Sequence, residues 1–194
     1  MTGPGRMNAD GDESLMEALA AGDDRGLNRL MDRWQAPLRG FLYRYTQNDQ
    51  DAMDLAQETF VRIHQHRRSY RPGARFSTWM FQIALNLARS RARWQRRHPG
   101  DAPDHATELP DTKAAATTEA DPADRALQAE RASLVRGAIA ELPADLREAV
   151  LLFEYEGKTH AEIAEIARTT AKAVETRLYR ARQRLRRALA RYLV

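Results

Sequence analysis

The residues of this chain best suited to chemistry are arginines, and they are concentrated near its end. From Arg168 to Arg191, nine basic residues stand against one acid, Glu175, which gives a net charge of +8. Val174, Leu178 and further apolar residues recur there at helical spacing, so most of the arginines fall on the other side of the helix. A cationic helix of this kind can contact the phosphates and base edges of duplex DNA. The pattern therefore indicates nucleic-acid binding.

A helix, a turn and a second helix would position these arginines. Thr159 and Glu162 have the spacing of a capping box and predict a helix start at residue 160. Residues 168–170 interrupt the apolar period, and residues 171–191 resume it. In such a helix-turn-helix the second helix enters the major groove with its N-terminal residues on the bases. We expect DNA contacts from Lys172, Ala173, Glu175, Thr176, Arg177, Tyr179 and Arg180, with Arg182 and Arg184 on phosphates.

A second basic block, residues 62–97, contains ten arginines and no acid. Opening duplex DNA costs about 1.4 kcal/mol per stacked step. Aromatic rings and arginines can recapture roughly 1–3 kcal/mol per unstacked base. The candidates for this role are Tyr70, Arg71, Arg75, Phe76, Ser77, Thr78, Trp79 and Asn86. Phe76 and Trp79 could equally be core residues, so we expect residues 71–75 and Asn86, rather than Trp79, to touch bases directly.

Three carboxylates provide an enzymatic alternative. Asp51, Asp54 and Glu58 lie at positions i, i+3 and i+7, where they could hold Mg²⁺ in a helical nuclease. Such a site needs ligands from a second element, and none stands out, since His64 and His66 point to different sides of a helix. Cysteine is absent, which excludes disulfides, thiolate zinc sites and cysteine nucleophiles. We therefore expect neither catalysis nor a metal or other cofactor, and a metal-dependent nuclease is a remote alternative.

The 194 residues, 43% of them hydrophobic, predict an all-α fold of two helical domains joined by a flexible linker. We expect a disordered tail at 1–12, a first domain at 13–97, an acidic linker at 98–122 and a second domain at 123–194. Between residues 101 and 130, eight acids stand against two basic residues, which suits a linker that repels nucleic acid. No apolar run approaches the roughly 18 residues of a membrane span, so we expect a cytoplasmic protein without membrane insertion.

Apolar spacing predicts the individual helices. The first domain should contain a helix over 15–30 with a break near Gly22, its continuation over 34–45, another from Asn48, and one over 77–96 after a loop at 69–75. The second domain should add helices over 123–141 and 143–155 before the helix-turn-helix. The side chains expected to point inward from the first domain are Leu38, Phe41, Leu42, Tyr45, Met53, Ala56, Phe60, Ile63, Met80, Ile83, Ala84 and Leu87.

The chain resembles the extracytoplasmic-function (ECF) sigma factors, bacterial transcription initiation factors with two conserved domains. The resemblance lies in four stretches that keep the family's order and spacing: residues 51–63, 70–88, 142–150 and the helix-turn-helix. It implies that the chain binds core RNA polymerase, melts the minus-ten element of a promoter and recognises the minus-thirty-five element as duplex. It also implies an anti-sigma factor that holds the protein inactive until a stress signal arrives.

The resemblance names the partner surfaces as the clamp helices of the polymerase's largest catalytic subunit and the flap of its second-largest subunit. The residues implied to bind polymerase are Asp54, Leu55, Gln57, Glu58 and Val61. Four of these share one helical face, which without the resemblance would be interpreted as a solvated acidic surface. Within the helix-turn-helix, Arg168 occupies a turn position where the family often has glycine, Lys172-Ala173 replaces the usual Gly-Thr, and Glu175 stands where a basic residue is common. A glutamate at that place can accept a hydrogen bond from a cytosine amino group.

A different class of protein remains as the alternative. An ordinary helix-turn-helix regulator would bind promoter DNA without core polymerase, and its first domain would be a sensor or an adaptor. Binding to core polymerase before promoter recognition would distinguish a sigma factor from such a regulator.

Overall fold

The computed structural model describes residues 9–98 and 122–192, and every regular element in those ranges is helical. The first domain contains α1 (Ala9–Ala20), α2 (Arg25–Thr46), α3 (Asp49–Gln65), the short 3₁₀ turn η2 (Arg67–Ser69) and α4 (Phe76–Arg97). The second contains α5 (Pro122–Ala140), α6 (Ala144–Val150), the π-helical turn η3 (Leu151–Tyr155), α7 (His160–Ala167), α8 (Ala171–Leu189) and the 3₁₀ turn η4 (Ala190–Tyr192). The all-α prediction is confirmed. None of the helices in these ranges is long and apolar enough to cross a bilayer.

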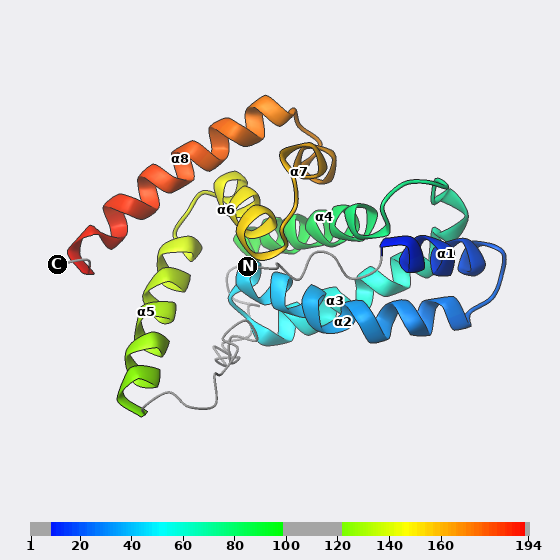
Figure 1. The fold of residues 1–194 in the computed structure, drawn as a ribbon, viewed down its shortest axis with the longest axis horizontal. Helices are drawn as coiled ribbons and strands as arrows, with labels where there is room; N and C mark the ends of the chain where they lie inside the picture. The colour runs from blue at the N-terminus through cyan, green and yellow to red at the C-terminus, as the bar shows by residue number, and fades with distance from the viewer. Residues whose placement is uncertain (1–8, 99–121, 193–194) are drawn as a thin grey trace.

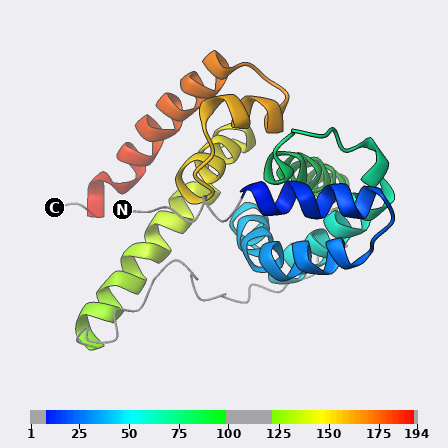
Figure 2. The same ribbon diagram turned by 45° about the vertical axis from the view of Figure 1, so that its right-hand side comes forward.

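In the first domain, α1 to α4 pack around one apolar core (Figures 1 and 2). Phe41 and Phe81 are fully buried and meet edge to face, with 5.1 Å between their ring centroids. Leu38, Leu42, Ala56 and Met80 are buried as the sequence predicts. Pro37 lies inside α2, and the helix continues through it, so the expected segment over 34–45 is the second half of one longer helix.

Two expectations about this domain are wrong. Met53 was expected to point inward, but its side chain is 38% exposed because Ala52, Ala56 and Phe60 take the inner face of α3. The expected tail at 1–12 ends too late, because α1 begins at Ala9. Asp12 is buried and accepts hydrogen bonds from Arg33 and Trp34, which fixes this start of the helix. Residues 1–8 of that tail lie outside the described residues.

The second domain is built around α6, η3, α7 and α8. Its buried side chains include Leu146, Leu151, Ile163, Ile166, Val174 and Leu178. A helix over residues 143–155 was expected; the structure starts it one residue later, at Ala144, with Pro143 as the N-cap and a π-helical turn at its end. The predicted linker at 98–122 lies outside the described residues except for its two ends.

The two domains are in contact. Helix α4 of the first domain packs against α7 of the second, and α2 contacts η3 and α5. Figure 1 shows α6 and α7 lying over α4, while α8 runs along the outer edge of the molecule. As a consequence, one long side of α8 remains open to solvent, whereas part of α4 is covered.

Candidate nucleic-acid and polymerase interface

The helix-turn-helix has the local geometry that the sequence predicts. The Thr159 hydroxyl accepts from the backbone N–H of Glu162, whose carboxylate accepts from the backbone N–H of Thr159, and this reciprocal capping box starts α7. Burial raises the pKa of Glu162, but its hydrogen bonds to Thr159 and the nearby cations outweigh burial and lower it. The carboxylate therefore stays ionised and holds the cap.

Arg168 turns the chain between the two helices. Its φ is 52° and its ψ is 57°, the left-handed conformation that glycine adopts most readily. The sequence places an arginine where the family often has glycine, and the structure shows that this position needs the left-handed backbone. Thr170 then starts α8 by accepting from the backbone N–H of Ala173. The turn is thus defined by one strained residue and one cap.

The exposed side of α8 carries the predicted groove residues. Tyr179 is 64% exposed, and Thr176 and Arg180 are also exposed. Lys172 and Glu175 form an ion pair across one turn, with 2.8 Å between Nζ and Oε2, and this hydrogen bond lowers the pKa of the Glu175 carboxyl. A free base edge would have to compete with Lys172 for this carboxylate. The negative charge of Glu175 is thus paired with Lys172 on the surface of the free chain.

Two predicted DNA-binding residues lie at the flank of α8. Arg177 is half-buried and directed to α6, where its Nε lies 3.5 Å from the Asp145 carboxylate. In this arrangement Arg177 therefore lies beside the buried face of α8 and not at the centre of its exposed face. Ala173, also partly buried, lies on the same flank. The face of α8 on which a side chain lies therefore determines whether it can reach a base.

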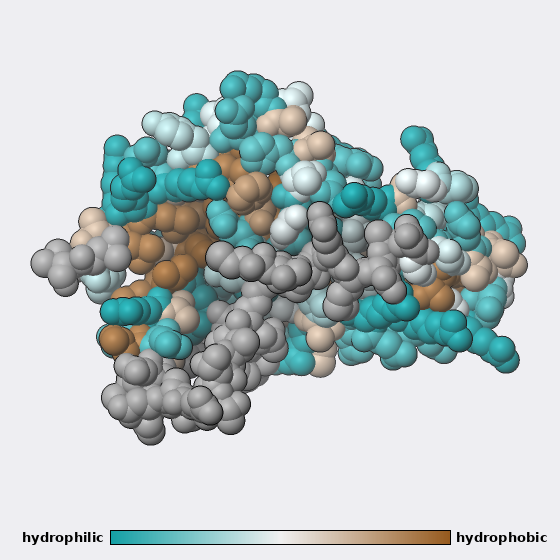
Figure 3. All heavy atoms as spheres, in the orientation of Figure 1, coloured by the Kyte–Doolittle hydropathy of each residue, from teal (hydrophilic) through white to brown (hydrophobic). Residues whose placement is uncertain are grey.

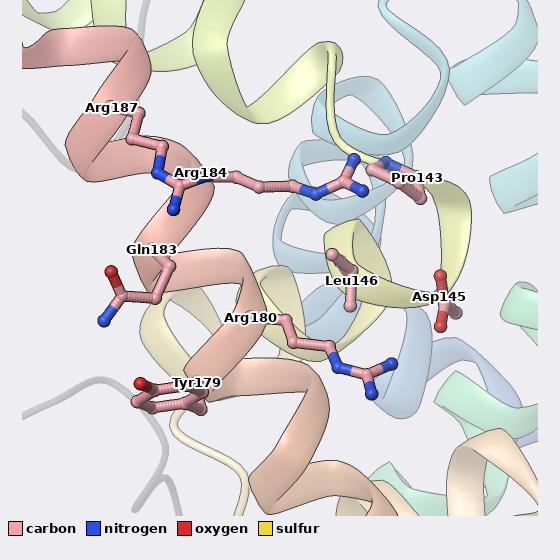
Figure 4. A pocket seen from close by; sticks show the side chains of 8 residues that line it. All are labelled: Pro143, Asp145, Leu146, Tyr179, Arg180, Gln183, Arg184 and Arg187. Carbon is pink, nitrogen blue, oxygen red and sulfur yellow. The ribbon is translucent and has the colours of Figure 1, made fainter.

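Beside the groove face lies an open pocket of about 410 Å³ between α8 and the start of α6. Arg180 and Arg184 extend from α8 over Pro143, Asp145 and Leu146 (Figure 4). Neither guanidinium forms an ion pair within the described part of the chain, whereas Arg182 pairs with Glu154 at 3.3 Å. Unpaired arginines on an exposed rim are suited to phosphate contacts. Arg180 was expected among the residues that contact bases, but it lies beside Arg184, which was expected to contact phosphates.

The predicted strand-binding residues divide into a buried set and an exposed set. The structure buries Tyr70, Phe76 and Thr78 almost completely. Phe76 packs on Trp34 in the core, and the Tyr70 hydroxyl donates to the carbonyl of Ala74 and so shapes the loop. In this arrangement the three side chains are covered by the core and offer almost no surface to a base. Their role here is to position the loop.

The residues that remain available are the loop arginines and the polar groups of α4. Arg71 is exposed and makes no ion pair with any described acid. Gly73 has a φ of +82°, so the tight loop that presents Arg71 and Arg75 requires glycine there. Asn86 is partly exposed and makes no hydrogen bond with a described residue, while Trp79 is half-buried against Tyr70. The loop arginines are thus more exposed than Trp79, whereas Asn86 and Trp79 are both only partly exposed.

Helix α3 carries the predicted polymerase-binding residues. Leu55 is 6% exposed and packs into the core, so it offers almost no surface to a partner in this arrangement. Val61 is 46% exposed, Gln57 is exposed, and Met53, one turn before Gln57, continues the same stripe. The sequence interpretation missed Met53, although its spacing of four residues from Gln57 could have placed it there. The exposed stripe of Met53, Gln57 and Val61 is called the α3 stripe below.

The carboxylates of α3 are occupied by arginines and amides. Asp51 is buried and contacts Arg91 at 3.2 Å and the Gln95 amide at 2.6 Å. Asp54 lies 3.7 Å from Arg91, and Glu58 forms a 2.6 Å pair with Arg62. Within the described ranges, no three His, Cys, Asp or Glu side chains gather as a metal site. The arrangement gives the nuclease alternative no support.

The fold and these surfaces define a two-domain DNA-binding protein, and comparison with known proteins identifies its family. Residues 30–98 match Sigma-70 region 2, and residues 133–185 match Sigma-70, region 4. The RNA polymerase sigma-H factor of Pseudomonas aeruginosa is 31% identical over 180 residues, which cover 92% of this chain and 93% of that protein. An ECF RNA polymerase sigma-E factor of Haemophilus influenzae is 32% identical over 181 residues, covering 89% of this chain and 92% of the relative. The chain belongs to the sigma-70 family of RNA polymerase sigma factors, in its ECF group.

Solved structures agree with this assignment. The structure of CnrH in complex with the cytosolic domain of CnrY matches 93% of this chain and 98% of that chain, with a TM-score of 0.68 and 25% identity. The fold is also that of the sigma factor RpoE in its complex with the anti-sigma factor NepR from Bartonella quintana, with a TM-score of 0.66 and 24% identity over 84% of this chain and 96% of that chain. The protein is therefore an alternative sigma factor, a transcription initiation factor.

Proposed function

We propose that this sigma factor binds core RNA polymerase through the α3 stripe and then presents its two cationic surfaces to a promoter. The α3 stripe is the main support for this proposal, because a regulator that binds only DNA does not need an exposed apolar surface on this helix. Met53 and Val61 are apolar side chains that are more than a third exposed on an otherwise amphipathic helix. Asp54 and Glu58 lie beside these apolar groups, each paired with an arginine of the chain, so the proposed contact is apolar at its centre and charged at its rim.

The partner of the α3 stripe is proposed to be the clamp helices of the largest catalytic subunit, as the family resemblance implies. A second contact is proposed for the flap of the second-largest subunit. Apolar side chains gather between α5 and α8, on the left of the molecule in Figure 3, and Leu127 and Val135 of α5 are exposed. A helical or looped apolar segment of polymerase could cover them. The two contacts would hold the two domains at different places on the enzyme.

DNA contacts are proposed only for residues that are at least partly exposed. Arg71, Arg75, Ser77 and Asn86 would bind the non-template strand of the minus-ten element after melting. In α8, the exposed residues Lys172, Glu175, Thr176 and Tyr179 would read the minus-thirty-five duplex, while Arg180, Arg182 and Arg184 would bind its phosphates. As a partner of polymerase on the chromosome, the protein would act in the cytoplasm. We also propose that an anti-sigma factor holds it inactive, since the similar RpoE of Bartonella quintana was solved with the anti-sigma factor NepR, and CnrH with the cytosolic domain of CnrY.

Reconstitution with bacterial core polymerase on a library of genomic promoters tests this function. The wild-type chain should bind core polymerase and direct transcripts from a defined promoter set. Val61→Asp should weaken core binding by about tenfold or more, as expected for a charge placed in an apolar contact. Asn28→Asp, at an exposed position of α2 outside both proposed contacts, provides a control with the same added charge. A chain that binds promoter DNA but not core polymerase would instead be a helix-turn-helix regulator.

A further inference from the structure

Helix α4 begins at Phe76 without a capping residue in its own segment. Arg75 precedes the helix, its side chain makes no capping hydrogen bond, and the first turn of α4 holds no acid. The first N–H groups of a helix have no partner inside the helix, so this start leaves donors to be satisfied from elsewhere. By contrast, α3, α7 and α8 each begin with a preceding side chain that accepts from the first turn.

Glu13 of α1 supplies an acceptor at this place. Its Oε1 atom accepts a hydrogen bond from the backbone N–H of Phe76 at 3.1 Å, although 63 residues separate the two. The side chain is half-buried, and a carboxylate here also meets the positive end of the helix dipole. A different helix of the same domain therefore caps α4. Capping patterns in the sequence do not reveal Glu13, because they extend over only about three residues.

Helix α1 is anchored well enough to hold this acceptor in place. Asp12, the residue before Glu13, is buried and accepts hydrogen bonds from Arg33 and Trp34 of α2. Met16, one turn further along α1, is fully buried in the core. One residue of α1 thus fixes the helix to α2, and the next residue reaches across to α4.

The start of α4 is also the end of the loop of residues 70–75. Helix α1 contacts η2 before this loop and α4 after it (Figure 1). The Tyr70 hydroxyl donates to the carbonyl of Ala74, and the rings of Tyr70 and Trp79 lie 5.3 Å apart between centroids. Burial raises the pKa of Tyr70 to about 12, with a further contribution from the charge of Glu13. The carboxylate is therefore close to both ends of the loop.

The charge of Glu13 also acts on the second domain. Burial lowers the pKa of Lys158, and Glu13 is one of three acids whose charges oppose this shift. Two roles for Glu13 are thus conceivable, one through its acceptor atom and one through its charge. They differ in what they require, because a helix cap needs an oxygen at the right reach, whereas the lysine needs a negative charge.

We propose that Glu13 is a positioning residue for recognition of the melted strand. By capping α4 it holds Arg75 and Ser77, on either side of the helix start, in register with the strand. A binding site needs its contacts held within about 0.5 Å, and side chains on a frayed helix end are not held so closely. Glu13 acts through the helix start and does not touch DNA. This inference rests on the proposed function, because it takes Arg75 and Ser77 as strand contacts.

The test uses the chain bound to core polymerase and a promoter from the set that the reconstitution identifies. The probe is a promoter fragment that mismatches hold open over the minus-ten element, with its non-template strand randomised there. Sequencing of the bound strands gives the preference, as the enrichment of the best sequence over the pool. Glu13→Ala should reduce this preference about fivefold, the effect that the loss of one helix cap carries.

Two further variants separate the acceptor from the charge. Glu13→Gln keeps an oxygen at the same reach without the charge, and it should retain the wild-type preference. Glu13→Asp keeps the charge but is one methylene shorter, so it should lose the preference as Glu13→Ala does. Glu17→Ala is the matched control and should change nothing. It removes an exposed acid one turn later on α1, whose carboxylate makes no hydrogen bond to the described residues of α4.

The outcomes distinguish positioning from a general loss of stability. A purely structural role would weaken the binding of all sequences equally, and an unchanged preference in Glu13→Ala would overturn the proposal. Loss of the preference in Glu13→Gln, or its retention in Glu13→Asp, would overturn it as well, because the effect would then belong to the charge. If Glu13→Ala proves unfolded by circular dichroism, Glu13→Asp still decides the matter.

Failure of the proposed function would be recognised before any variant is compared. A wild-type chain that does not bind core polymerase, or that binds it and selects no strand sequence, would overturn the proposed function and this inference with it. A wild-type chain that selects a sequence, together with a Glu13→Ala chain that selects it equally well, would overturn this inference alone.

Discussion

Arg89 and Glu148 join the two domains through a two-hydrogen-bond ion pair, although 59 residues separate them in the chain. The side chain of Glu148 is 3% exposed and that of Arg89 is 26% exposed. Removing one partner of a buried pair leaves the other charge without compensation, which costs more than the pair contributes on its own. The stability of the contact between the two domains therefore depends on the charge of Glu148.

Glu148→Ala should destabilise the folded chain by about 3 kcal/mol, because Arg89 and the Tyr45 hydroxyl lose their acceptor in a buried place. The free energy of unfolding from urea titration measures this effect. The double variant Arg89→Met with Glu148→Leu should recover most of the loss, since it removes both charges. Equal stability of Glu148→Ala and the wild type would show that the ion pair between Arg89 and Glu148 does not form in solution.

Arg168→Gly should stabilise the protein by roughly 0.5–1 kcal/mol. The left-handed conformation at φ 52° costs about 1–2 kcal/mol for a residue with a Cβ, and the greater freedom of glycine in the unfolded chain offsets part of the gain. Thermal unfolding followed by circular dichroism checks the change. Thr169→Gly, one residue later in the same turn, is the matched control and should destabilise, because Thr169 has no positive φ. A loss of stability in Arg168→Gly would contradict the strain.

Arg180→Ala should weaken binding to promoter duplex and lower the slope of log K against log salt by about 1, as expected when one phosphate contact is lost. The reason is that Arg180 is exposed on the rim beside α6 and has no acidic partner among the described residues. Fluorescence anisotropy at several salt concentrations measures the slope. Arg131→Ala, an exposed arginine of α5, should leave it unchanged. An unaltered slope in Arg180→Ala would refute the assignment.

Glu175→Ala should change base preference and leave the salt slope nearly constant. The carboxylate pairs with Lys172 at 2.8 Å in the free chain, and on DNA it can accept from a cytosine amino group instead. Selection from a randomised duplex library should show a weaker preference for cytosine at one position. Lys172→Ala serves as the comparison, since it should reduce the salt slope. An unchanged selected sequence in Glu175→Ala would remove Glu175 from base recognition.

Alkaline pH should destabilise the folded chain between pH 10 and about 12. Burial, with a further contribution from Glu148, raises the pKa of Tyr45 from 10.0 to about 12, and burial also raises that of Tyr70 to about 12. A phenol whose pKa is higher in the folded state gives stability that is fully present below pH 10 and is lost as the pH rises through 12. Urea titrations across this range should show the fall.

Tyr45→Phe isolates one of these two phenols. The variant should show a smaller loss of stability between pH 10 and 12 than the wild type, because phenylalanine does not titrate. Lys158 has the opposite effect on the free energy of unfolding. Burial lowers its pKa, so below pH 10.5 the unfolded chain binds more protons than the folded chain, and stability rises with pH there. An identical pH dependence in Tyr45→Phe and the wild type would show that Tyr45 is not buried.

Local sequence patterns determined much of this protein. The spacing of Val174, Leu178 and Ala181 and the capping box at Thr159 predicted the helix-turn-helix, because periodicity and capping act over a few residues. The same kind of pattern predicted α4, the loop before it and the helix that α6 and η3 form, whose start it placed one residue too early. The net charge of each segment indicated where nucleic acid would bind. These features follow from neighbours in the chain.

Tertiary structure decided which of the predicted residues are accessible. Leu55, Tyr70, Phe76 and Thr78 lie in predicted functional segments, yet neighbouring helices bury them. Met53 is exposed although it is apolar, because smaller side chains fill the inner face of α3. Whether a side chain meets the core or the solvent depends on partners far away in sequence, and helical periodicity does not specify them. The contact between Arg89 and Glu148 is of the same kind, because only the packing of α4 against the second domain brings the two charges together.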